Sequence, residues 1–382
     1  MNTHVKTLDL SEQKVVDVHC FAFSEDAKNL TKEKLYSLFW IGGPTVGSVK
    51  SAPVEQNEVE ECLNYKLFIK FLSKFLKCEK HQVLLERNKR CERFQEYLDE
   101  LFSDAKIEEF VFDSGLKTVK DEELKRYFPR RYQKVFRLEP LISELLENSK
   151  SLDELLQRFE QTLERVLSSG YKGFKSVIAY RSGLDVQSWS RKELEEEFVN
   201  RKLEWFGPVV KKIRDELFIT ALKVCAKRRA MLQIHTGLGD TDVVAEKCNP
   251  ILLKGVLMRE EFWDAKVVLV HGGYPFLAEA CWLSKVFPNV YVETSSPFPP
   301  TYIAPLSVER FYTVLGSAPL TKIVYGSDAF EIPELHWIAA KLTKLSLEVA
   351  LSKMIELGVL DEEEAYRSAK MVLYQNAHTL LG

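Results

Sequence analysis

Eight short runs of apolar residues, mostly β-branched and aromatic, recur along the chain, and longer stretches with helical periodicity separate them. This alternation is typical of repeated strand–helix units, and near-continuous apolar runs such as KVVLVHGG, from Lys266, are typical of parallel strands covered on both faces. The expected strands are Val15–Phe21, Ile107–Ser114, Tyr132–Glu139, Gly173–Arg181, Met231–Thr236, Lys266–His271, Asn289–Thr294 and Lys322–Asp328. The pattern therefore predicts an α/β fold with a parallel sheet.

The sheet could be a closed barrel or an open doubly wound sheet. An open sheet usually concentrates its chemistry at one switch point, whereas the catalytic groups of a barrel come from the ends of many strands. Polar residues close most of the eight runs here. We therefore expect one (β/α)8 TIM barrel over residues 1–382, a length that barrels with insertions commonly reach.

The stretch from residue 25 to 105 is too long for a single connection between a strand and its helix. Within it, YKLFIKFLSKFL, from Tyr65, and RCERFQEYLDELF, from Arg90, have the spacing of amphipathic helices. We expect a helical insertion after the first strand that covers part of the barrel mouth. Two loops rich in Gly, Pro and Ser, from Trp40 to Pro53 and from Ser295 to Pro305, are expected near that mouth, the second as a rigid surface loop or a wall of the mouth.

Composition and charge exclude several classes of function. The formal net charge is -3, and Lys and Arg alternate with Asp and Glu, which argues against nucleic acid as a partner and favours a small-molecule substrate. No apolar stretch approaches the roughly 18 residues of a membrane span, and the start lacks the apolar core of a signal peptide. The seven cysteines form no CxxC pair. We expect a cytoplasmic protein whose thiols are reduced. We also expect that the protein can form homo-oligomers.

Candidate metal ligands stand at the ends of the predicted strands. His19, His235 and His271 are three of only seven histidines, and Asp328 closes the last run. Any one of these histidines alone is more often a structural residue, but a barrel brings the strand ends around a single mouth. A catalytic zinc ion needs about three protein ligands and an open position. The four residues together therefore indicate a metal centre.

A lysine in a largely apolar strand, Lys175, requires a partner because burying an ammonium group is costly. It either pairs with an acid at a strand end, such as Glu139, or takes part directly in metal chemistry. Arg137, Glu139, Tyr180 and Arg181 form either an ion-pair network or a site for an anionic substrate. We name Glu139, Arg181, Tyr274 and Glu293 as candidate substrate-binding residues.

Several motifs resemble one known family. DVHCF at Asp17, QIHTGLGD at Gln233, VLVHGGYP at Val268, YVET at Tyr291 and YGSD at Tyr325 resemble the amidohydrolase-related, metal-dependent TIM-barrel hydrolases. They are most similar to the branch that includes the N-terminal domain of FluG-type proteins, which also has segments like GFKS and AYRSGL. The resemblance extends from residue 15 to the end of the chain.

The resemblance implies a site with one or two metal ions that activates water. The matching ligands are His19, His235, His271 and Asp328, and Lys175 is the position that some members carboxylate to bridge two ions. His271 and Asp328 are the implied catalytic residues, and Asp328 would accept a proton from water whose pKa the metal lowers.

The sequence departs from the family pattern at one ligand position. Phe21 replaces the second histidine of the HxH motif, and residues two apart on a strand share a face. Cys20 is expected to face the helix layer as a core thiol. We therefore expect one divalent ion, zinc in the first instance. The leading hypothesis is a hydrolase of an amide, ester or similar carbonyl compound. A decarboxylase with the same ligands and a metal-free binding barrel are the alternatives.

Overall fold

The computed structural model describes residues 8–39, 56–115, 119–201, 210–240, 242–295 and 304–382. Within these ranges eight strands form one sheet in the order β1 to β8, and each strand is parallel to the next. Their bounds are β1 Val15–Phe21, β2 Ile107–Asp113, β3 Arg131–Arg137, β4 Gly173–Ser176, β5 Met231–His235, β6 Lys266–Val270, β7 Val290–Glu293 and β8 Ile323–Val324. Every predicted strand is present.

Backbone hydrogen bonds close the sheet between its first and last strands. The Val18 amide donates to the Tyr325 carbonyl at 3.0 Å, and the Phe21 amide donates to the Ala329 carbonyl at 2.8 Å. Sheet edges with unpaired backbone groups are thereby removed. The (β/α)8 TIM barrel predicted from the alternating pattern is confirmed.

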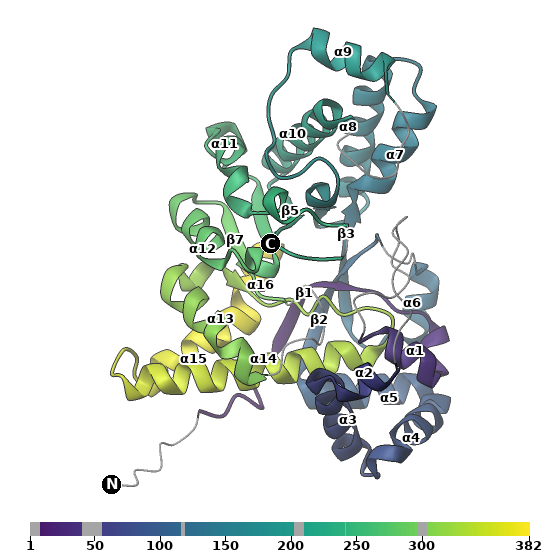
Figure 1. Ribbon diagram of the computed structural model, residues 1–382, viewed down its shortest axis with the longest axis vertical. Helices are drawn as coiled ribbons and strands as arrows, with labels where there is room; N and C mark the ends of the chain where they lie inside the picture. The colour runs from purple at the N-terminus through teal and green to yellow at the C-terminus, as the bar shows by residue number, and fades with distance from the viewer. Residues whose placement is uncertain (1–7, 40–55, 116–118, 202–209, 241, 296–303) are drawn as a thin grey trace.

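Helices cover the outside of the barrel (Figure 1). Those between the strands or after them are α6 Asp121–Tyr127, α7 Leu138–Asn148, α8 Leu152–Ser168, α9 Arg191–Val199, α10 Lys211–Arg228, α11 Lys254–Leu257, α12 Leu277–Val286, α13 Ala304–Ser317, α14 Pro333–Glu356, α15 Glu362–Lys370 and α16 Asn376–Leu381. Buried valines such as Val16, Val111 and Val268 fill the barrel, and Ala377 and Leu380 of α16 pack against them. The C-terminal helix therefore contributes to the barrel core.

Some predicted runs are longer than the strands they contain. Residues 178–180 form a 3₁₀ turn directly after β4, and α7 begins at Leu138, where the third run was expected to continue. In the last run only Ile323 and Val324 pair with β7. Apolar periodicity does not distinguish a strand from the short buried turn that follows it, which is why the strand ends were misplaced.

A β-bulge in β1 determines which side chains reach the mouth. The register with β2 shifts between Asp17 and Cys20, so the alternation of side chains is interrupted there. Val16 and Val18 pack inside the barrel, Cys20 packs in the outer core, and His19 contacts residues of the mouth. The expectation that Cys20 faces the helix layer is confirmed.

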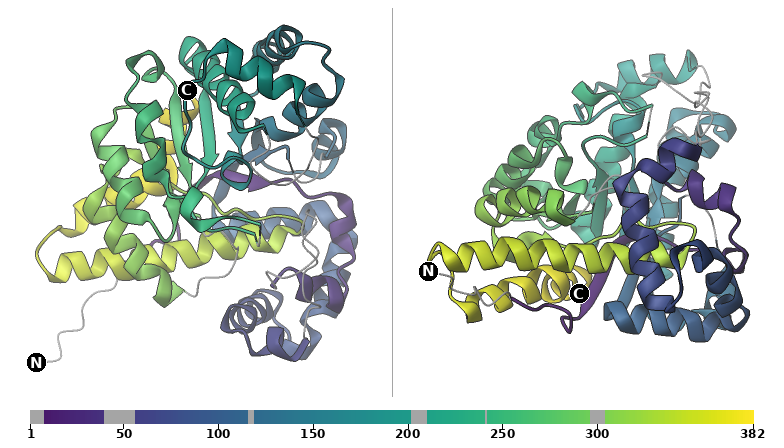
Figure 2. Two further views of the ribbon diagram at one scale, coloured as in Figure 1. Left: turned by 45° about the horizontal axis from the view of Figure 1, so that its top comes forward. Right: turned by 60° about the horizontal axis from the view of Figure 1, so that its bottom comes forward.

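In the described part of the segment between β1 and β2 there are five α-helices: α1 Lys32–Ser37, α2 Gln56–Glu61, α3 Leu63–Leu76, α4 Val83–Arg90 and α5 Phe94–Ala105. The two amphipathic segments expected from Tyr65 and Arg90 correspond to α3 and α5. In Figures 1 and 2 the long helix α14 runs from α13 and α15 to this group of helices, and α14 packs against α5. That the insertion covers the mouth stays a prediction.

The two expected loops fall mainly on residues 40–55 and 296–303, outside the described ranges. Among the helices of the described ranges, none is both long and apolar enough to cross a membrane. All seven cysteines are free thiols.

A buried lysine on α14 makes stability depend on pH. Lys344 is 4% exposed, and its ammonium donates to the Ser11 carbonyl at 2.9 Å. Burial is the main cause that lowers the pKa of Lys344 from 10.5 to about 8. Between these two values the unfolded chain binds a proton that the folded chain has lost, so folding stability gains from this group as pH rises through that window.

Replacing Lys344 with methionine should raise the free energy of unfolding at pH 7 by about 1–3 kcal/mol, since the cost of burying the charge disappears. This gain should shrink as pH rises from 8 to 10. Urea unfolding of wild type and variant at several pH values measures it. The exposed Lys353→Met change is the control. A gain for Lys344→Met that is independent of pH would contradict the prediction.

Candidate metal centre

Three predicted ligands meet at the C-terminal ends of the barrel strands. His19 lies on β1, His271 directly follows β6, and Asp328 follows β8. One donor atom from each lies within 4.8 Å of the other two, and His19 Nε2 lies 3.1 Å from Asp328 Oδ1. The histidines are buried, and the side chain of Asp328 is 13% exposed.

Hydrogen bonds determine the tautomers of two histidines. The Gln233 amide group donates to the Val18 carbonyl at 2.7 Å, so its oxygen faces His19 Nδ1 at 3.1 Å and accepts the proton there. His271 Nδ1 lies 2.8 Å from Ser295 Oγ, which itself donates to Glu293 Oε2 at 2.6 Å. Both rings therefore carry their proton on Nδ1 and present the lone pair of Nε2, the arrangement found in metal-binding histidines.

His235, at the end of β5, is the fourth candidate. Its ring packs against the ring of His271, with centroids 4.7 Å apart, and against Tyr180 at 4.4 Å. His235 Nε2 is buried and has no hydrogen-bond partner among the described residues. A methyl group at Gly239 would lie 2.9 Å from this nitrogen and would clash with the Tyr180 hydroxyl, so a side chain is not tolerated there. His235 is not part of the group of three donors.

This donor set fits a divalent cation. Two imidazole lone pairs and a carboxylate are typical zinc ligands, and the unpaired nitrogen of His235 lies beside them. Burial is the main cause that lowers the pKa of His19, His235 and His271 well below the usual value, and nearby positive charge, including Lys175, adds to it. Neutral imidazoles are the form that binds a metal.

Lys175, on β4, supplies positive charge to the same cluster. Its Nζ lies 3.2 Å from His19 Nε2, and its side chain is 1% exposed. Burial lowers its pKa to about 8, against the attraction of Asp113, Asp328 and Glu293. Burial raises the pKa of Asp328 well above its usual value, and the Lys175 ammonium opposes this. Lys175 is thus bonded to a histidine, and the alternative pairing with Glu139 is not found.

Glu293 and Asp17 support the two ligands that follow strands. The carboxylate of Glu293 accepts from the His271 backbone amide at 3.0 Å, and Asp17 Oδ1 accepts from the Ser327 amide at 2.9 Å. His271 and Asp328 have φ values of 65° and 55°, a left-handed conformation that costs energy in non-glycine residues. These bonds hold both residues in it.

Phe21, next to a guanidinium group, occupies the position at which the motif resemblance led us to expect a second histidine. The ring of Phe21 lies 5.7 Å from the ring of His19, and the Arg137 guanidinium lies 5.9 Å from the Phe21 ring. Arg137 Nε donates to Asp113 Oδ2 at 3.0 Å, and a second bond from Nη2 makes the pair bidentate. Phe21 therefore stands beside an ion pair and offers no ligand atom of its own.

Glu139 lies apart from the histidines. Its Oε1 accepts from Ser176 Oγ at 2.9 Å and from the Val177 amide at 2.6 Å. It borders a cavity of about 10 Å³ that Arg214 also lines. Among the described residues no contact joins Glu139 to the three histidines, and its role toward a substrate stays a prediction.

Arg181 and Tyr274 join loops that follow different strands. Arg181 Nη1 lies 3.5 Å from Asp242 Oδ2, and the Tyr274 carbonyl accepts from the Leu238 amide at 2.8 Å. Both side chains are partly buried. The structure therefore places them on the loops after β4 and β6, and their role toward a substrate stays a prediction.

The sequence-based search for ligands missed Gln233, Ser295 and Asp17. Gln233 lies two residues before the predicted ligand His235, and Ser295 lies two residues after the predicted site residue Glu293. The available signal for Gln233 was a polar residue inside an apolar strand.

A barrel with histidine, lysine and aspartate at its strand ends defines a class of metal-dependent enzymes. A model of the amidohydrolase family matches residues 160–382, more than half of the chain. The chain therefore belongs to the amidohydrolase family. Lys175, His235, His271 and Asp328 lie within the matched region, whereas His19 and Phe21 precede it.

One curated relative is the fluG protein of Emericella nidulans, which is 31% identical over 227 residues, 54% of this chain and 25% of the fungal protein. The chain thus spans about a quarter of that relative's length.

Solved structures share the fold. A provisionally named metal-dependent hydrolase from Lactobacillus casei ATCC 334 superposes with a TM-score of 0.82 at 22% identity, over 98% of each chain. The uronate isomerase of Thermotoga maritima gives a TM-score of 0.67 at 13% identity, over 97% of this chain and 94% of the other. At such identities the likeness shows the fold alone.

Proposed function

We propose that this protein is a metal-dependent hydrolase that acts on an amide, ester or similar carbonyl compound with one divalent ion, zinc in the first instance. The observation that carries the proposal is the cluster of His19, His271 and Asp328, whose donor atoms lie within 4.8 Å of one another at the mouth. A bound divalent ion would supply Lewis-acid polarisation of a carbonyl oxygen and would acidify water.

Each residue of the cluster has a role in this proposal. The Nε2 atoms of His19 and His271 and the carboxylate of Asp328 would hold the ion, and His235 Nε2 is the additional donor beside them. Asp328 would accept a proton from the attacking water. Lys175 acts as a free ammonium group that balances the charge of Asp328, since one ion leaves no pair for a carboxylated lysine to bridge.

Phe21 and Arg137 favour one ion over two. The apolar ring offers no ligand, and the guanidinium repels a second cation. Arg181 and Tyr274, from the loops that follow β4 and β6, are the proposed contacts to a small-molecule substrate. Glu293 would act by holding His271 through its backbone amide.

Metal binding tests the proposal. The protein should be stripped with a chelator and titrated with Zn²⁺ or Mn²⁺, and bound metal measured by elemental analysis. His271→Ala should lose one equivalent, with affinity at that site falling by more than the roughly 10–100-fold typical of changes outside the ligand shell. His235→Ala should lower the affinity for the same metal ion.

The exposed His81→Ala is the matched control and should retain all the metal. If His271→Ala binds as much as wild type, the hydrolase proposal fails and the chain is to be treated as a binding barrel. If His271→Ala loses the metal as expected, product analysis separates hydrolysis from decarboxylation, because decarboxylation of an aromatic acid releases carbon dioxide whereas hydrolysis of an amide or ester does not.

A further inference from the structure

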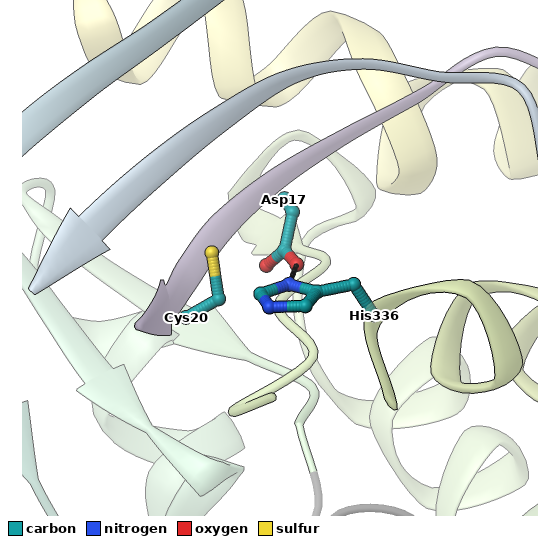
Figure 3. A group of neighbouring side chains, drawn as sticks. All are labelled: Asp17, Cys20 and His336. Carbon is teal, nitrogen blue, oxygen red and sulfur yellow. Dashed lines mark ion pairs between the residues drawn. The ribbon is translucent and has the colours of Figure 1, made fainter. Parts of the chain in front are cut away.

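A second group of metal-binding side chains lies outside the barrel, behind β1. Asp17 and Cys20 come from β1, and His336 comes from the first turns of α14. Figure 3 shows the Asp17 carboxylate next to the His336 ring and the Cys20 side chain beside both. One donor atom from each residue lies within 4.8 Å of the other two, and all three side chains are fully buried. None of the three belongs to the cluster at the mouth.

Both ring nitrogens of His336 are buried and have no hydrogen-bond partner among the described residues. Among the described residues, His336 Nδ1 faces Asp17 Oδ2 at 3.7 Å, which is too long for a hydrogen bond. Phe23 and Phe110 pack on the ring with centroids 5.5 Å away. A buried imidazole without a hydrogen-bond partner costs about 1–3 kcal/mol. A ligand from outside the chain that binds a ring nitrogen would remove this cost.

The donor set selects a class of ligand. A thiolate, an imidazole and a carboxylate are each zinc ligands, while sulfur is a poor ligand for Mg²⁺ or Ca²⁺. Two ligands of one tetrahedral zinc ion lie about 3.3–3.8 Å apart, given bond lengths of about 2.0–2.3 Å. The 3.7 Å separation of Asp17 Oδ2 and His336 Nδ1 is within a few tenths of an ångström of the roughly 3.3–3.6 Å expected for an oxygen and a nitrogen ligand.

Asp17 can serve this ion and keep its present contacts. It accepts from the Ser327 amide at 2.9 Å and from Ser327 Oγ at 2.5 Å, and an ionised carboxylate has about four lone-pair positions. An ion held by Asp17 and His336 would join β1 to α14 and would stiffen the segment that carries Asp328.

We propose that Asp17, Cys20 and His336 form a second, structural site for a thiophilic divalent cation such as Zn²⁺, separate from the centre at the barrel mouth. The ion would enter as the chain folds, because the site is closed to solvent, and the thiol proton would be released to water. The site rests on its own geometry and does not depend on the proposed hydrolase activity.

Cobalt distinguishes the two sites because a thiolate bound to Co²⁺ absorbs strongly in the near ultraviolet, and the mouth cluster contains no sulfur. The full chain should be produced or refolded with Co²⁺ and its spectrum and metal content measured. Wild type and His271→Ala should show the thiolate band. Cys20→Ser should lose the band and one equivalent of metal, and His336→Phe should lose the same equivalent.

Cys225→Ser, which removes a buried cysteine elsewhere, is the matched control and should keep the band. If folded wild type shows no thiolate band, or if Cys20→Ser keeps it, the structural site does not exist and water is the better occupant. If wild type shows the band but His271→Ala binds as much metal as wild type, only the hydrolase proposal is overturned. A missing band with that equivalent intact would overturn only this site. The wild-type spectrum decides the question even if Cys20→Ser or His336→Phe fails to fold.

Discussion

Replacing Asp328 with asparagine should lower kcat by a factor of about 10²–10⁴, the range typical of a lost general acid or base. An amide oxygen can still contact a cation, but it cannot accept a proton from the attacking water. Asp328 is suited to this role because it is 13% exposed at the mouth and lies 3.1 Å from His19 Nε2. Burial raises its pKa, with Lys175 opposing that shift, and a bound cation would likewise favour the ionised form.

The measurement is hydrolysis of p-nitrophenyl esters and anilides of small acids by the Zn²⁺- or Mn²⁺-loaded protein, with metal content determined on the same samples. Asp328→Asn should keep most of its metal, which separates it from His271→Ala. Asp264→Asn is the control, since that side chain is 68% exposed and pairs with Arg229. An Asp328→Asn protein with metal bound and an unchanged kcat would assign the proton transfer to another group.

The sequence predicts the barrel well because its signals are local. A strand buried on both faces needs a continuous apolar run, and KVVLVHGG, from Lys266, satisfies this requirement by itself. The third run, from Tyr132, does so less well, since Val135 is the only buried residue of β3. The errors occur where a turn is also apolar, as at residues 178–180 after β4. The bulge in β1 was not predictable from alternation, because it depends on the register with β2 between Asp17 and Cys20.

The candidate ligands were predictable because each stands at a strand end, where a barrel gathers them. Their partners were not. That His19 presents Nε2 depends on Gln233, whose amide is oriented by the Val18 carbonyl, and such a relay follows from side-chain rotamers across two strands. The pairing of Arg137 with Asp113 beside Phe21 likewise joins residues from three strands. Sequence spacing contains no signal for contacts of this kind.

A buried ion pair formed across 247 residues of sequence helps to hold the insertion against α14. Arg87 Nε of α4 donates to Glu334 Oε1 of α14 at 2.6 Å, and both side chains are at most 1% exposed. Tyr97 Oη donates to the same oxygen at 2.8 Å. Arg87 Nη1 also donates to the Lys28 carbonyl at 2.9 Å. The pair therefore connects three parts of the insertion to the helix that follows β8.

Replacing Arg87 with methionine should lower the free energy of unfolding by about 3–5 kcal/mol, because Glu334 would remain as a buried charge without its partner. Glu334→Leu should cost a similar amount by leaving the guanidinium unpaired. The double variant Arg87→Met/Glu334→Leu should recover much of the loss, since no isolated charge then remains in the core. Urea unfolding of the four proteins gives the coupling energy. Arg90→Met, which breaks the exposed pair with Glu100, should cost no more than about 1 kcal/mol. Equal losses for Arg87→Met and Arg90→Met would mean that burial of the Arg87 pair does not determine how the insertion is held. A larger loss for Arg87→Met, with recovery in the double variant, would show that the insertion is attached to α14 through this charge pair.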